Sequence, residues 1–175
     1  MKDKALATRK LTYLALITAA TIVGRTLFQS LPNIQPVTDI ILFVTLYFGI
    51  QEGFLVGLLT ILITNLYMGM GVWTVFQILS YGAVVLVTYI LRRVLRNRFY
   101  LQVLHSILMG FLYGFVISLF YVLSFMGLEK FLAYYLAGIS FDFFHGVGNG
   151  VLYIILIPIL TRLTDKYFNK EQYRE

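Results

Sequence analysis

The sequence of 175 residues contains no cysteine and only eight acidic residues, against fourteen Lys and Arg. The absence of cysteine excludes disulfides, thiolate catalysis and cysteine-ligated metal sites. The resulting net charge of +6 would suit a nucleic-acid-binding protein, but the basic residues stand at the ends of apolar runs, which is how membrane topology signals are arranged. A nucleic-acid partner is therefore not expected.

Motifs for ATP hydrolysis and for metal or nucleophilic catalysis are also missing. The sequence has no G-x-x-x-x-G-K-[ST] phosphate loop, so the chain is not expected to hydrolyse ATP itself. The two histidines, His105 and His145, are predicted to lie at opposite membrane faces, where they cannot share a metal ion. Asp142 and His145 are the one candidate pair for a small membrane enzyme, but no glycine-flanked serine accompanies them.

Long apolar runs make up most of the chain. Hydrophobic residues account for 59% of it and the mean hydropathy is +0.83, both above the values of a soluble domain. The runs recur at the length that crosses a bilayer, so the sequence predicts an all-α integral membrane protein of six transmembrane helices, formed by residues 1–175 as a single domain. The expected spans are about 11–28, 37–50, 54–68, 73–91, 103–126 and 139–163.

The distribution of charge predicts the orientation of these spans. Twelve of the fourteen Lys and Arg fall on one side, while Lys130 lies on the other side and Arg25 within the membrane. By the positive-inside rule both termini are cytoplasmic, and the basic N-terminus precedes a retained first span of a multi-pass cell-membrane protein. The inner halves of the spans are apolar apart from Glu52 and His105, which disfavours a self-sufficient carrier or channel.

The stretch from Gly24 to Asp39 is polar in an otherwise apolar chain. Arg25 lies inside one apolar run and Asp39 opens the next, and a charge at membrane depth costs several kcal/mol unless it is paired or reaches the headgroups. We therefore expect Arg25 to pair with Asp39 or Asp142, with a snorkelling Arg25 as the alternative. The loop between them adds the candidate amides Gln29, Asn33 and Gln35.

Two further helices carry a polar stripe on their predicted outer halves. A carboxylate, an imidazole and an amide fall within an arc of about 80° of the last span at 100° per residue, where they would line a ligand cavity or bond to neighbouring helices. A second stripe opens the fourth span, although its Trp could also be a membrane anchor. The candidate ligand-binding residues of these segments are Asn65, Trp73, Gln77, Asp142, His145 and Asn149.

The first span also contains a pair of small residues, Ala15 and Ala19, one helical turn apart. Such a small-xxx-small pair allows another helix to approach closely. Helical geometry places Arg25 about 100° from this groove. The alanines and Arg25 should therefore face different neighbours.

Together these features resemble the membrane-embedded S components of energy-coupling factor (ECF) transporters, which import vitamins. The resemblance rests on six short spans, the alanine pair, a Pro-rich outer loop and the opening of the sixth span at residues 139–149. It implies that Ala15 and Ala19 contact the transmembrane T component. It also implies that the first outer loop, the turn between spans three and four, and a lid at residues 127–138 bind substrate.

Within that family, Gly24-Arg25, the segment 31–36 and the Phe-Asp-x-x-His opening are most similar to the cobalamin-type members. The resemblance implies that the chain captures a vitamin outside and delivers it through a T component and two ATPase subunits. No cofactor is implied, since the partners use the ATP. The amides would suit the carboxamides of a corrinoid, but they would suit riboflavin, folate, thiamine or a precursor nearly as well.

Overall fold

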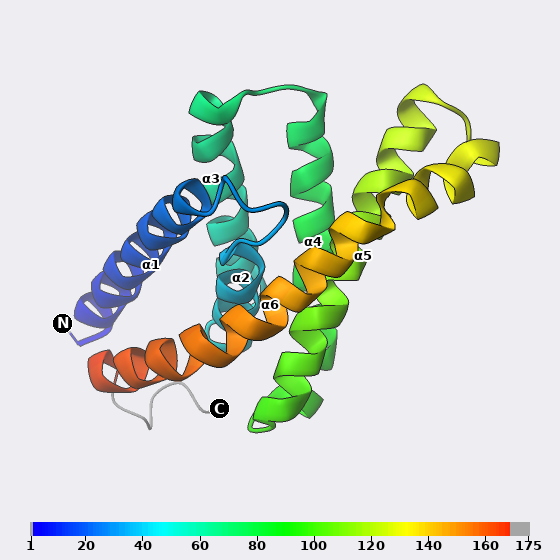
Figure 1. The fold of residues 1–175 in the computed structure, drawn as a ribbon. Coiled ribbons are helices and arrows are strands. Elements are labelled where there is room, and N and C mark those ends of the chain that lie inside the picture. Colours follow the sequence, from blue (N-terminus) through cyan, green and yellow to red (C-terminus); the bar gives the residue numbers. More distant parts are fainter. Residues whose placement is uncertain (1, 169–175) are drawn as a thin grey trace.

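The computed structural model describes residues 2–168, with side chains from residue 6 onward. Within this range the chain forms six α-helices and one short 3-10 helix, η1, and no strand (Figure 1). The all-α prediction is thus confirmed. The elements are α1 (Lys2–Leu27), α2 (Val37–Tyr47), α3 (Ile50–Met68), α4 (Val72–Leu95), α5 (Phe99–Phe125), η1 (Leu128–Lys130) and α6 (Phe131–Tyr167).

Five of the described helices are long and apolar enough to cross a membrane, and α2 is the exception. Its 11 residues rise only about 16 Å, roughly half of the hydrocarbon thickness of a bilayer. All residues from Val37 to Leu46 are buried, and α2 contacts each of the other five α-helices. The helix therefore forms the centre of the bundle (Figure 1).

Glycines on α3 allow α2 to lie this close to it. A Cβ atom at Gly53 would overlap the hydroxyl of Thr45, and one at Gly57 would come within 3.0 Å of Ile41. Since both α2 residues are fully buried, neither can move into open space. The close contact between α2 and α3 therefore depends on these two missing side chains.

Two boundaries differ from the expected ones. The turn after α2 lies at Gly49, whose φ of +121° favours glycine, so α3 begins at Ile50 rather than after Gly53. The expected lid at residues 127–138 is instead η1 followed by the first two turns of α6. Gly127, whose φ is +90°, separates α5 from η1, whereas the single glycine Gly138 lies inside α6 without ending the helix.

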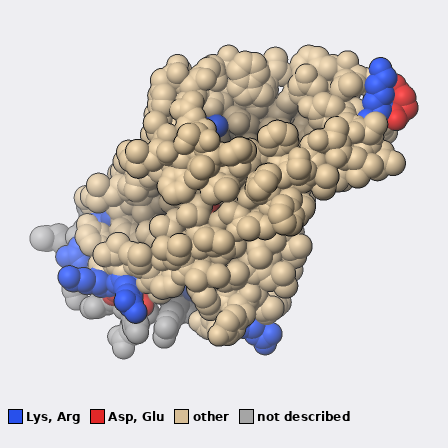
Figure 2. All heavy atoms as spheres, viewed as in Figure 1, with Lys and Arg blue, Asp and Glu red and all other residues tan. Residues whose placement is uncertain are grey.

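The two ends of the bundle differ in charge. Basic side chains gather where α4 and α6 end, and we call this the basic end; its described members are Arg92, Arg93, Arg96, Arg98, Arg162 and Lys166. Figure 2 shows basic groups at one end, a mostly uncharged middle, and a basic and an acidic group side by side at the far tip. Lys170 and Arg174, which belong to the same expected cluster, lie outside the described residues. At this end Lys10 also forms an ion pair with Glu52.

The opposite end, which we call the outer end, is covered by the loop between α1 and α2. Ile34 of this loop lies over Gly148 of α6, and Pro36 lies against Gly24 of α1. The Nδ2 of Asn33 donates to the Phe141 carbonyl at 3.3 Å. The loop thus connects α1 to α6 directly above the N-terminus of α2.

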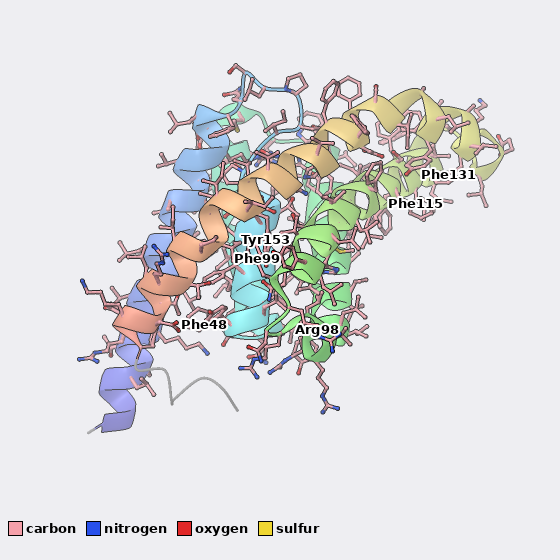
Figure 3. The ribbon with its side chains drawn as sticks, turned by 60° about the horizontal axis from the view of Figure 1, so that its bottom comes forward. Phe48, Arg98, Phe99, Phe115, Phe131 and Tyr153 are labelled. Atoms are coloured by element: carbon pink, nitrogen blue, oxygen red, sulfur yellow. The ribbon has the colours of Figure 1, made fainter. Side chains whose placement is uncertain are left out.

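Beyond this loop, the end of α5 and the start of α6 form a protruding pair that we call the outer hairpin, residues 115–141 (Figure 1). Aromatic rings hold its two arms together. The ring centroids of Phe115 and Phe131, both labelled in Figure 3, lie 5.3 Å apart, and those of Tyr121 and Tyr134 lie 5.1 Å apart. Contact with the body includes Phe76 of α4, which is 6.2 Å from the Phe120 ring.

Candidate functional site

A buried cluster joins α1, α3 and α4 in their outer halves, and we call it the Arg25 network. Arg25 is 8% exposed, and its Nη1 donates to Thr64 Oγ1 and, at 3.1 Å, to Asn65 Oδ1. The Nδ2 of Asn65 donates in turn to Thr74 Oγ1 at 2.8 Å and to Gln77 Oε1 at 2.7 Å. The structure therefore brings together Arg25, Asn65 and Gln77, three of the residues that the sequence indicated.

The expected ion pair between Arg25 and Asp39 or Asp142 is wrong. Neither carboxylate forms an ion pair with Arg25 in the described part of the chain. Asp39 accepts a hydrogen bond from the Ser106 hydroxyl at 2.7 Å, and Asp142 lies against Gly114, where a Cβ atom would overlap its carboxylate. The snorkelling alternative is wrong too, because α3 supplies buried neutral acceptors to the guanidinium.

A second cluster surrounds the first turn of α2 and extends to α5 and α6. Asp39 is fully buried, and Ser106, its hydrogen-bond donor, also accepts at its carbonyl from Asn149 Nδ2 at 3.3 Å. Thr38 Oγ1 and His145 Nε2 are 2.9 Å apart. In this structure, then, the side chains of Asp39, His145 and Asn149 form hydrogen bonds with neighbouring helices rather than lining an open cavity.

This second cluster is only partly satisfied. Asp39 Oδ2, His145 Nδ1 and Asn149 Oδ1 are buried and have no hydrogen-bond partner among the described residues. An unpaired buried polar atom costs about 1–3 kcal/mol, so such atoms are rare in folded proteins. Three such atoms lie around one turn of α2, so this turn carries polar groups that the neighbouring described helices do not fully satisfy.

The remaining candidates lie at the outer surface. Gln29 and Asn33 are exposed and Gln35 is half-buried, all within the loop before α2. Trp73 is 51% exposed and covers Gly71 rather than facing the Arg25 network. The helical stripe that grouped Trp73 with Gln77 therefore splits, because Gln77 faces Asn65 while Trp73 faces outward.

Sequence reasoning missed the hydroxyl residues of both clusters. Thr64 and Thr74 hold Arg25 and Asn65, and Thr38 and Ser106 hold His145 and Asp39. In a membrane helix Thr and Ser often bond to the carbonyl one turn back, as Thr64 does to Thr60, and so they give little indication of a site. The sequence did contain one signal for these hydroxyl residues, because each of them lies within about one helical turn of a charged or amide residue.

A comparison with models of known protein families identifies the family of this chain. A family model described as the substrate-specific component of ECF transporters matches residues 9–157. The chain belongs to this family. Neither the curated proteins nor the solved structures gave a match.

Membership makes this S component a multi-pass protein of the cell membrane and a transport subunit, not an enzyme. Proteins of this family work with a T component and ATPases. The enzyme alternative built on Asp142 and His145 is thereby set aside. In this S component the Arg25 network and the cluster around α2 are fixed polar groups within an apolar bundle.

The alanine pair of this S component lies on the surface of α1. Ala15 and Ala19 are both exposed, whereas Leu14 and Thr18 on the other face are buried. Arg25 points into the bundle, so the alanines and Arg25 face different neighbours, as the helical geometry predicted. Ala15 and Ala19 are therefore available to another helix.

The S component also has two hollows at its basic end. One of about 450 Å³ lies between the ends of α2 and α6 and the turn before α5, and Gln102 and Thr161 are among its lining residues. Tyr153 borders this region and donates to Gln102 Oε1 at 3.1 Å. Its ring lies 6.3 Å from that of Phe99, and Figure 3 labels the two residues next to each other. A second of about 540 Å³ is lined by Tyr89, Ile90, Arg92, Arg93 and Arg96. Both are far from the candidate residues of the outer loop.

Proposed function

We propose that this S component binds a vitamin at its outer end, with cobalamin as the substrate, and delivers it through a T component and two ATPase subunits. The observation that supports this most is the Arg25 network, a fixed polar group beneath an outer loop in a chain of the S-component family. Above it, Gln29 and Asn33 present amides to the outside, and Gln35 is partly accessible. Amides both donate and accept, which suits the many carboxamides of a corrinoid.

The remaining candidates complete this proposal. Trp73 offers an exposed aromatic face beside the turn between α3 and α4. The buried Asp39, Asp142, His145 and Asn149 would fix the helices beneath the ligand. The assignment to cobalamin has alternatives of the same kind, namely riboflavin, folate, thiamine or a precursor, because amide side chains alone do not distinguish among them.

Identification of the bound ligand tests the substrate. The protein would be purified in detergent, and small molecules that accompany it identified by mass spectrometry. Isothermal titration would then compare cobalamin, riboflavin, folate and thiamine. We expect one molecule of cobalamin per chain and the highest affinity for it. A higher affinity for another vitamin would replace cobalamin, and no binding of any would contradict the vitamin-binding function.

Reconstitution tests the dependence on partners. Vesicles containing only this chain should bind the vitamin without accumulating it, because the sequence has no phosphate loop for ATP hydrolysis. Addition of a T component, two ATPases and ATP should start uptake. Accumulation by the chain alone would show that it is a self-sufficient carrier.

Bulky substitutions test the role of Ala15 and Ala19. The double variant Ala15→Trp, Ala19→Trp should abolish uptake and leave ligand affinity nearly unchanged, because both side chains are exposed and face away from Arg25. Leu86→Trp, at an exposed site on α4, is the matched control and should retain uptake. Equal loss of binding and uptake in the double variant would place the alanines in the ligand site instead.

A further inference from the structure

Arg25 is a buried cation whose hydrogen-bond partners are all neutral. Its Nη1 is held by Thr64 and Asn65, and neither partner carries a charge. In the described residues the one ion pair is that of Lys10 with Glu52, at the basic end. A charge taken out of water is stable only with an opposite charge or with dense hydrogen bonding, so the positive charge of Arg25 is left largely uncompensated.

The two buried carboxylates that could have neutralised it are engaged or held elsewhere. Asp39 accepts from Ser106, and Asp142 is wedged against Gly114 of α5. Tyr81 lies within electrostatic reach of both Arg25 and Asp39, and Tyr113 of both Arg25 and Asp142. The two tyrosine rings pack on each other at 4.7 Å, so the charges share neighbours without touching.

The guanidinium is nevertheless held in one orientation. Thr64 and Asn65 come from one turn of α3, and Asn65 is fixed by Thr74 and Gln77 of α4. Among the described residues no hydrogen bond reaches the Nε or Nη2 atoms of Arg25, and neither is a fully buried unpaired atom. Arg25 thus keeps a pair of adjacent donors free, in the planar geometry that binds a carboxylate or a phosphate through two parallel hydrogen bonds.

We propose that the ligand of this S component carries an anionic group, a carboxylate or a phosphate ester, that binds Arg25. The inference rests on the proposed function and narrows the substrate class. Cobalamin qualifies through its phosphodiester and folate through its carboxylates. Free riboflavin, which is neutral, and thiamine, which is a cation, do not. Arg25 then contributes to affinity, because the ligand supplies the negative charge that no described residue places beside the guanidinium.

Matched ligand pairs test this on the purified full-length protein. Cobalamin is compared with cobinamide, which lacks the phosphodiester together with its ribose and base, and folate with its dimethyl ester, in which both carboxylates are esterified. Each pair is titrated against the unsubstituted protein, Arg25→Gln, Arg25→Lys and the control Lys130→Gln, which removes an exposed cation of the outer hairpin. The two pairs separate phosphate recognition from carboxylate recognition.

We expect the unsubstituted protein to prefer the anionic member of one pair by about 30-fold or more. Arg25→Gln should lower the affinity for that member to the level of the analogue without the anionic group, and should leave the affinity for that analogue unchanged. Arg25→Lys should keep part of the preference, and Lys130→Gln all of it. Equal affinity for both members, or an equal loss for both in a folded Arg25→Gln variant, would overturn the proposal.

Two further measurements keep the test decisive. If Arg25→Gln does not fold, as judged by its thermal unfolding, Arg25→Lys carries the comparison, since it retains the charge and loses the paired donors. If neither vitamin binds, the vitamin assignment fails, and acetate and methyl phosphate test the anion site separately. They should raise the melting temperature of the unsubstituted protein more than that of the Arg25 variant, and an equal rise would overturn the site.

Discussion

The central helix α2 and the outer hairpin are both rich in apolar residues, yet they are stabilised in different ways. Every residue from Val37 to Leu46 of α2 is buried, and the helix contacts all five others. The outer hairpin exposes Leu132, Leu136 and Phe141, and its aromatic rings contact mainly one another. A change near α2 should therefore destabilise the whole bundle, whereas a change in the hairpin should act locally.

The difference also concerns polarity. The α2 region contains fully buried polar groups, such as Asp39 and Thr38, whose partners lie on α5 and α6. The polar groups of the hairpin, such as Glu129 and Lys130, stand at its exposed tip. Polar side chains thus tie separate helices together at the centre and remain solvated at the outer end. Four experiments test this contrast, from the largest expected effect to the smallest.

Gly53→Ala should have the largest effect, a loss of about 3 kcal/mol in the free energy of unfolding. The new Cβ would overlap Thr45 Oγ1 and come within 3.1 Å of the Thr45 Cα, which is backbone in the middle of α2. Unfolding in mixed micelles, followed by circular dichroism, measures this. A change below about 0.5 kcal/mol would show that α2 can shift, and that the centre is less rigid than its burial indicates.

Ser106→Ala should follow, with a loss of about 2 kcal/mol. It removes the hydrogen bond to Asp39 Oδ1 and leaves a fully buried carboxyl group without a partner in the described structure. Ser140→Ala, at an exposed position of the hairpin, is the control and should change stability by no more than about 0.5 kcal/mol. Similar losses in both variants would show that the buried and the exposed polar groups contribute equally to stability.

Replacing the ring pair of the hairpin should have a smaller and local effect. A double-mutant cycle of Phe115→Leu and Phe131→Leu should give a coupling of about 1 kcal/mol, because the two rings meet edge to face at 5.3 Å. Hydrogen exchange should accelerate in residues 115–141 and stay unchanged in α2. Acceleration throughout the bundle would mean that the hairpin unfolds together with the centre.

Gly138→Ala should have the smallest effect, a gain of up to about 1 kcal/mol. A Cβ atom there meets nothing within 4 Å, and alanine favours the helix over glycine. The variant is the matched counterpart of Gly53→Ala, since it makes the same chemical change in the other region. A loss of stability in Gly138→Ala would indicate that the hairpin packs against something that the isolated chain does not contain.

The sequence allowed the membrane class, the number of helices and the location of the basic charges to be predicted, because these depend on local properties. An apolar run of sufficient length forms a helix in lipid whatever its neighbours are, since no water is available to its backbone. The polarity of the segment from Gly24 to Asp39 was equally visible, and Arg25, Asn65 and Gln77 do come together. These inferences needed no knowledge of helix packing.

Only the tertiary structure decided which helix is central and which partner each polar group has. A buried helix and a lipid-facing helix can have the same composition, because a protein core and lipid tails are both apolar, so the sequence did not distinguish α2 from its neighbours. The partner of Arg25 depends on the rotation and crossing of α1 against α3, which places Thr64 and Asn65, rather than Asp39, beside it. Opposite charges attract, but helix packing determines which atoms come within reach.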